Sequence, residues 1–161
     1  MHSRIYQVSN KPIPKREWAT PDDFYENSDD FADYIGDKQE GDARKEDIRS
    51  LAKTMSELFD LDKSGNALVY KGGLEEFCKK WADAIHDAAK EVTAENVIRV
   101  DSRYNVRMMC KETHLESSCR FSIVDYQSYA GPMSDLVKWI FYGKMKPGAK
   151  VFIGAVIDYH W

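Results

Sequence analysis

Apolar residues recur every three or four positions in two long segments of the chain, the spacing of one face of an α-helix. The longer segment predicts a helix from about Gly73 to Val92, with Trp81 at the centre of its apolar face. The other predicts a helix that begins near Asp42 and whose apolar face reaches Phe59. Its charged side chains fall on the opposite, solvated side: Arg44, Lys45, Glu46, Arg49, Lys53 and Glu57.

Two shorter helices are predicted from capping residues. Thr20, with Pro21 after it and Asp23 three residues on, marks a helix start near the N-terminus. An apolar stripe continues from there through Phe24, Phe31, Tyr34 and Ile35, and residues 36–42 are predicted as a loop. Ser134 is expected to cap a helix over Asp135–Tyr142 that ends at Gly143.

Between these helices the period changes to two, which is typical of a β-strand with one buried face. Residues 98–111 alternate in this way, and we expect Cys119–Tyr126 to be the returning strand. Arg4–Ser9 and Ala67–Tyr70 are further strand candidates. Val151–Tyr159 is apolar on both faces, as expected of a central strand.

These elements predict a single α+β domain over residues 1–161. We expect four or five mainly antiparallel strands that pack three longer helices, on one face of the sheet. Residues 1–42, an acidic strand and helix segment, are expected at its periphery.

Composition agrees with a globular domain. Of 161 residues, 43% are hydrophobic and 31% are charged. No apolar run approaches the roughly 20 residues of a membrane span, and the first residues do not resemble a signal peptide. Three cysteines in such a chain predict reduced thiols and a cytoplasmic protein.

The charge is unevenly distributed along the chain. Residues 22–42 hold nine acidic residues and one lysine, a formal charge of −8 within a chain of net charge −4. Aromatic residues lie among these carboxylates, a combination that suits a protein interface better than a solvated tail. The candidate partner-binding residues are Asp22, Asp23, Phe24, Tyr25, Asp29, Asp30, Phe31 and Asp33. Helix-capping carboxylates on a solvated surface are the alternative.

A row of basic residues follows one face of the predicted strand at 98–111: Arg99, Arg103, Arg107 and Lys111. Left unpaired, these side chains would attract phosphates or an acidic protein surface. The alternative is a solvated face with ion pairs to neighbours such as Asp101. The acidic balance of the chain and the lack of aromatic residues beside the bases disfavour nucleic-acid binding.

Three patterns contain some of the residues of a metal site or a catalytic site, but none contains a complete set. Cys110, His114 and Cys119 have the residue types of a zinc site but no fourth ligand at a standard spacing. The last two, with Asp125, could instead form a thiol nucleophile and its base. Residues 60–71 begin like a calcium loop, but a lysine stands where the closing glutamate should be. We therefore predict no enzyme, no metal and no cofactor.

Segments at both ends of the chain carry a resemblance. They are Ser3–Ser9, Pro12-Ile13, Asp23-Phe24-Tyr25-Glu26 and residues 153–160. In these segments the chain resembles small uncharacterised proteins carried by bacterial mobile elements. The resemblance implies a bacterial or phage accessory protein and supplies no catalytic residue.

The sequence thus predicts a small bacterial accessory protein that acts through contacts with a protein partner. One alternative is an acidic inhibitor that imitates nucleic acid toward a nucleic-acid-processing enzyme. Another is a Cys/His enzyme or a nucleic-acid binder that uses the basic row.

Overall fold

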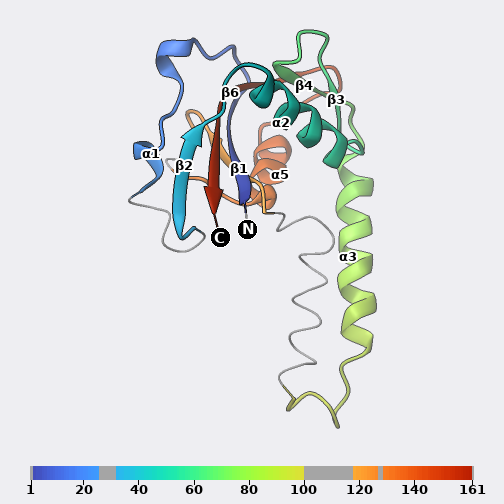
Figure 1. Ribbon diagram of the computed structural model, residues 1–161. Coiled ribbons are helices and arrows are strands. Elements are labelled where there is room, and N and C mark those ends of the chain that lie inside the picture. The colour runs from blue at the N-terminus through green and yellow to red at the C-terminus, as the bar shows by residue number, and fades with distance from the viewer. Residues whose placement is uncertain (1, 26–31, 100–117, 127–128, 161) are drawn as a thin grey trace.

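The computed structural model describes residues 2–25, 32–99, 118–126 and 129–160 (Figure 1). These residues confirm the α+β prediction, with a mixed, mostly antiparallel sheet of six strands rather than four or five. The elements in chain order are β1 (His2–Ser9), η1 (Lys15–Glu17), α1 (Asp22–Tyr25), β2 (Tyr34–Lys38), α2 (Gly41–Thr54), β3 (Phe59–Leu61), β4 (Ala67–Tyr70), α3 (Leu74–Lys90), β5 (Arg120–Ile123), α5 (Met133–Tyr142) and β6 (Lys150–His160).

β6 organises the sheet. Along one edge it pairs antiparallel with β1 over almost its whole length, from Ser9↔Phe152 to His2↔His160. Its other edge is shared, because β4 pairs with residues 150–152 and β2 with residues 157–160. The strand order is β3-β4-β6-β1-β5, with β2 beside β6. The prediction of a central strand at the end of the sequence is confirmed, and it brings the chain ends side by side (Figure 1).

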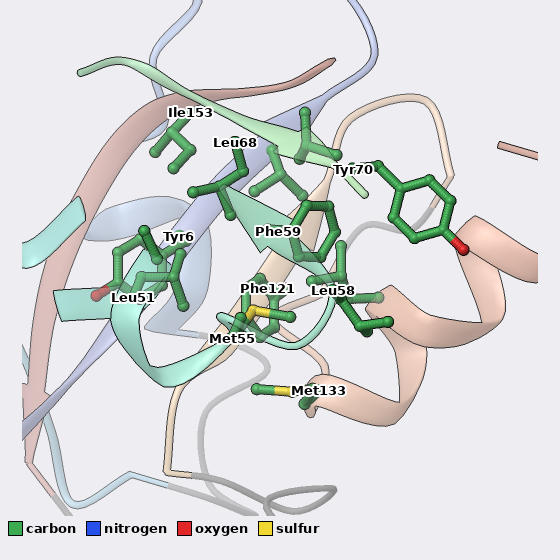
Figure 2. Packing of buried hydrophobic residues seen from close by; sticks show 14 of the residues in the cluster. Tyr6, Leu51, Met55, Leu58, Phe59, Leu68, Tyr70, Phe121, Met133 and Ile153 are labelled. Atoms are coloured by element: carbon green, nitrogen blue, oxygen red, sulfur yellow. The ribbon is translucent and has the colours of Figure 1, made fainter. Parts of the chain in front are cut away.

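One face of the sheet carries the larger hydrophobic core. Leu51 of α2, Met55 directly after that helix and Met133 of α5 pack on Tyr6 and Phe121 of the sheet (Figure 2). Tyr6 and Phe121 stack with their ring centroids 5.9 Å apart. The partly buried residues of α3 reach the same cluster, so α2, α3 and α5 lie on this face, whereas the N-terminal helix α1 lies on the opposite one.

The opposite face has a smaller core beneath η1 and α1. Ile5, Ile35, Ile157 and Tyr159 project from the strands and are covered by Phe24 of α1, with Trp18 packed at the margin. β1 lies between β5 and β6 and contributes to both cores. The segment from 1 to 42 therefore supplies a central strand.

α3 matches its predicted range and extends beyond the sheet (Figure 1). Its first turns pack on the larger core through Leu74, Phe77 and Trp81, which are half-buried, and Ala88 alone among its residues is fully buried. Among the described residues, no helix is both long enough and apolar enough to cross a bilayer.

Two expectations around α2 are wrong. Residues 34–38 form β2 rather than part of a helix and a loop, and Gly36 permits its close approach to β6. A Cβ atom at Gly36 would lie 3.0 Å from an Asp158 carboxylate oxygen. At the other end, α2 stops at Thr54, so Phe59 packs on Tyr70 of the neighbouring strand instead of extending the helix.

Toward the C-terminus, the observed elements differ from the predicted ones in their bounds. α5 begins two residues earlier than predicted, at Met133, with Pro132 rather than Ser134 before its first residue. The strand predicted at Cys119–Tyr126 is present as β5, which pairs in parallel with β1. Most of the strand predicted at 98–111 lies outside the described residues. Its first two residues do not begin a half-buried strand. Ile98 is 83% exposed, and Arg99 lies in a turn in which its N–H donates to the Asn96 carbonyl.

β6 contains a bulge opposite Gln7. Tyr6 pairs with Val156 and Val8 with Ile153, so Gln7 faces both Gly154 and Ala155. Such a bulge leaves backbone groups without ladder partners. The Gln7 side chain serves one of them, accepting from the N–H of Ala155 at 3.1 Å. It also accepts from the N–H of Ala19 at 3.0 Å and donates to the Glu17 carbonyl at 2.9 Å, outside the sheet.

Candidate functional site

The predicted acidic contact segment has two different kinds of residue. Asp22, Asp23 and Asp33 are exposed, as a contact surface requires. Phe24, however, is 3% exposed and is part of the smaller core, so it is not an interface anchor. Tyr25 is 46% exposed. Asp29, Asp30 and Phe31 lie outside the described residues.

The exposed carboxylates follow one edge of the molecule, from α1 along β2 to the start of α2. The Tyr25 hydroxyl donates to the Ile35 carbonyl at 3.1 Å and so holds the end of α1 beside β2 (Figure 1). We call this surface the acidic edge and define it by Asp22, Asp23, Asp33, Asp37, Glu40 and Asp42.

Most of the acidic edge lacks a basic partner among the described residues. Asp42 pairs with Lys45 at 3.2 Å, and Asp33 lies 3.6 Å from the His160 ring. Asp23 accepts from the backbone N–H and hydroxyl of Thr20, which confirms the predicted helix start. Asp22, Asp37 and Glu40 make no ion pair within the described parts of the chain.

Carboxylates on α2 and α3 contrast with the acidic edge. On α2, Glu46 pairs with Arg49 at 2.8 Å, and Glu57, in the turn after α2, pairs with Lys80 of α3 at 2.6 Å. Asp83 and Asp87 pair with Lys79 and Lys90. These four carboxylates each have a basic partner, whereas Asp22, Asp37 and Glu40 of the acidic edge have none among the described residues.

Of the predicted basic row, Arg99 alone lies within the described residues. Arg99 lies in the turn after α3, and Arg103, Arg107 and Lys111 lie outside the described residues. Cys110 and His114 lie outside them too, whereas Cys119 is half-buried at the start of β5. Within the described ranges, no three His, Cys, Asp or Glu side chains are grouped to hold a metal ion.

The loop that begins like a calcium site is a turn held by ion pairs. Lys150 lies 2.7 Å from one Asp62 oxygen, and the Ser64 N–H donates to the other at 2.8 Å. The hydrogen bond with Lys150 is the main reason that the pKa of Asp62 is held below its ordinary value. Asp60 pairs with Lys71, so lysine amines occupy the positions that a cation would need.

Charged residues also join the ends of β1 and β6. Arg4 donates to Asp47 of α2 at 2.7 Å and to the Asp158 carboxylate. The other Asp158 oxygen lies 2.9 Å from His2. Burial opposes the charge on Arg4, but its hydrogen bond with Asp47 and the nearby carboxylates raise its pKa. The network ties a helix to two strands, which is a structural role.

One charged residue that the sequence placed in solvent is buried. Arg44 is 6% exposed and fills the gap between β4 and β2 on the edge of β6. Its guanidinium donates to the carbonyls of Ile153 at 2.6 Å and Gly154 at 3.0 Å, and to the Asn66 side chain at 2.6 Å. Burial lowers its pKa. Arg44 lies four residues before Ile48, on the same helix face, and this spacing is the signal that could have predicted its burial.

Trp18 closes the space above Arg44. The guanidinium lies 4.6 Å from the centre of the indole ring, and the Lys15 amine lies 5.6 Å from it. The indole N–H donates to the Ile13 carbonyl at 3.1 Å, which fixes the ring. These side chains line a pocket of about 400 Å³ at the start of α2.

Comparison with known proteins adds no assignment. The chain matches no protein-family model, no curated protein and no solved structure. The acidic edge and the pocket beside Arg44 are the two candidate sites that the described residues offer.

Proposed function

We propose that this protein is a binding protein whose acidic edge engages a basic surface of a protein partner. The observation that carries the proposal is that Asp22, Asp37 and Glu40 are exposed without a basic partner among the described residues. Keeping such like charges together costs electrostatic energy that a basic partner would relieve.

Exposed aromatic side chains support a protein as the partner. Tyr25 and Tyr34 lie on the acidic edge and are 46% and 58% exposed. Tyrosine is enriched at the energetic centres of protein interfaces because its ring packs while its hydroxyl forms a hydrogen bond. Carboxylates around such rings would orient the bound partner and raise the rate at which it associates.

Zero-length carbodiimide cross-linking in an extract of the native cell tests this proposal. The reagent couples a carboxylate to a lysine amine in contact with it. We expect cross-links from Asp22, Asp37 or Glu40 to lysines of one partner. Raising the salt from about 50 to 500 mM should weaken that complex about tenfold, since exposed charges are screened.

The matched variants change charge equally. D22N/D37N/E40Q removes the three carboxylates of the acidic edge that have no partner among the described residues, and E46Q/D83N/D87N removes three carboxylates from α2 and α3. The first should lose the partner and the second should keep it. Equal recovery with both variants, or cross-links that map only to α2 and α3, would overturn the proposal.

A further inference from the structure

The pocket beside Arg44 has an excess of positive charge. Lys15, Arg44 and Lys45 line it, and Glu40 is the one carboxylate among its described lining residues. Lys15 has no carboxylate partner within the described residues. Lys45 pairs with Asp42, whose side chain is 99% exposed, and such solvated pairs contribute little. Both lysines are therefore available to a ligand.

Arg44 adds a buried charge that no carboxylate neutralises. Each of its three nitrogens donates once, in every case to a neutral oxygen. A guanidinium has five N–H groups, so one remains on each terminal nitrogen. A buried cation is stabilised most by an anion that also accepts its remaining hydrogen bonds. Within the described part of the chain, the hydrogen-bond acceptors of this guanidinium are all neutral, and no carboxylate forms an ion pair with it.

The remaining walls suit an organic group. Ile13 and Phe152 give the pocket an apolar side, and Trp18 holds the guanidinium against its ring. Gly41, the first residue of α2, also lines the pocket, and the exposed N–H groups of a first helical turn add partial positive charge. No atom lies within 4 Å of the position that a Gly41 Cβ would take, so this side is open.

We infer that this pocket binds a small phosphorylated organic molecule. Its phosphoryl group would lie among Arg44, Lys15 and Lys45, and its organic part would contact Ile13 and Phe152. A phosphomonoester fits the charge better than a carboxylate does, because it carries nearly two negative charges at neutral pH and three acceptor oxygens. The pocket adjoins the acidic edge, because Glu40 belongs to both. The two take ligands of opposite charge, and this inference does not depend on the proposed function.

Titration calorimetry with phenyl phosphate, inorganic phosphate and benzoate tests the inference, in low-salt buffer without phosphate. Phenyl phosphate should bind at least about tenfold more tightly than benzoate, since it can accept more charge-assisted hydrogen bonds. In NMR spectra, phenyl phosphate should shift the indole N–H resonance of Trp18, assigned with W18F. Absence of binding at millimolar concentration, or benzoate binding as tightly, would overturn the inference.

Variants that preserve the fold localise the site. K15Q/K45Q removes two exposed lysines of the pocket, and K53Q/K63Q removes two exposed lysines that do not line it. We expect the first pair to weaken phenyl phosphate binding about tenfold and the second less than about twofold. Equal weakening by both pairs would mean that only diffuse charge attracts the ligand and would also overturn the inference.

Discussion

The guanidinium of Arg44 donates to the carbonyl of Gly154 at 3.0 Å, across 110 residues of sequence. With its second bond, to Ile153, it serves two consecutive carbonyls of β6 at the bulge, in the gap between β4 and β2. A side chain on α2 thus takes the place of a strand in the sheet.

Replacing Arg44 should destabilise the fold strongly. R44A would leave the carbonyls of Ile153 and Gly154 buried without their donor and would remove the packing on Trp18. We expect the free energy of unfolding to fall by about 3 kcal/mol in urea titrations. R44K should recover only part of this, since an ammonium lacks the planar fork. R49A, at an exposed position of the same helix, should cost less than about 0.5 kcal/mol, and equal losses for R44A and R49A would contradict the buried role.

Gly154 should not tolerate a side chain. A Cβ atom there would lie 2.5 Å from the Gln7 amide oxygen and 3.0 Å from Ile13. Three hydrogen bonds hold Gln7 in place, so G154A should cost about 1–3 kcal/mol of unfolding free energy. In a double-mutant cycle, Q7A should relieve the clash, and the combined cost should be smaller than the sum of the single costs. Additive costs would contradict this contact.

Adjacent aromatic residues of α1 should respond differently to substitution. Phe24 is 3% exposed, so F24A should lower the free energy of unfolding by about 3 kcal/mol. Y25F loses only the hydroxyl that bonds to Ile35 and should cost about 1 kcal/mol or less. Thermal and urea unfolding measure both values. A near-neutral F24A would restore Phe24 as a candidate partner contact.

Asp62 should contribute to the acid sensitivity of the fold. Its hydrogen bonds with Lys150 and Ser64 hold its pKa below the ordinary value, so the folded state favours the ionised carboxylate. This contribution is fully present above the unfolded pKa of about 3.9 and is lost as the pH falls through the lower folded pKa. Urea titrations between about pH 2 and 6 should therefore show a shallower acid dependence for D62N than for the wild type. D60N, at the more exposed position nearby, is the matched control, and identical slopes for D62N and the wild type would contradict the assignment.

Elements with a strong local pattern were predictable. α3 and β6 carry uninterrupted helical and strand patterns, and both occur at the expected positions. β2 escaped prediction because Tyr34–Lys38 contains a glycine and two charged residues, and it becomes a strand only by pairing with β6. Phe59 continues the helical spacing of α2, but pairing with Tyr70 places it in a strand. In both cases a distant partner decides the structure.

The sites were less predictable than the fold, since residue type alone does not reveal burial. Phe24 looked like an exposed anchor because acidic residues surround it in sequence, yet it covers the smaller core. Arg44 looked solvated because it is charged, yet its helix position directs it toward β6. The exposed carboxylates Asp22, Asp23 and Asp33 were predictable because charged groups remain hydrated unless they are paired.

The position of β6 at the centre of the sheet has a consequence for folding kinetics. β1, β2 and β4 precede it in the sequence, and each pairs with it across a long stretch of chain. Closing such long loops slows folding, because chain entropy is lost before the pairing energy is gained. Until β6 docks, the edges of three strands are open to other chains. We therefore expect the docking of this one segment to limit the folding rate and to set the interval in which the protein can aggregate.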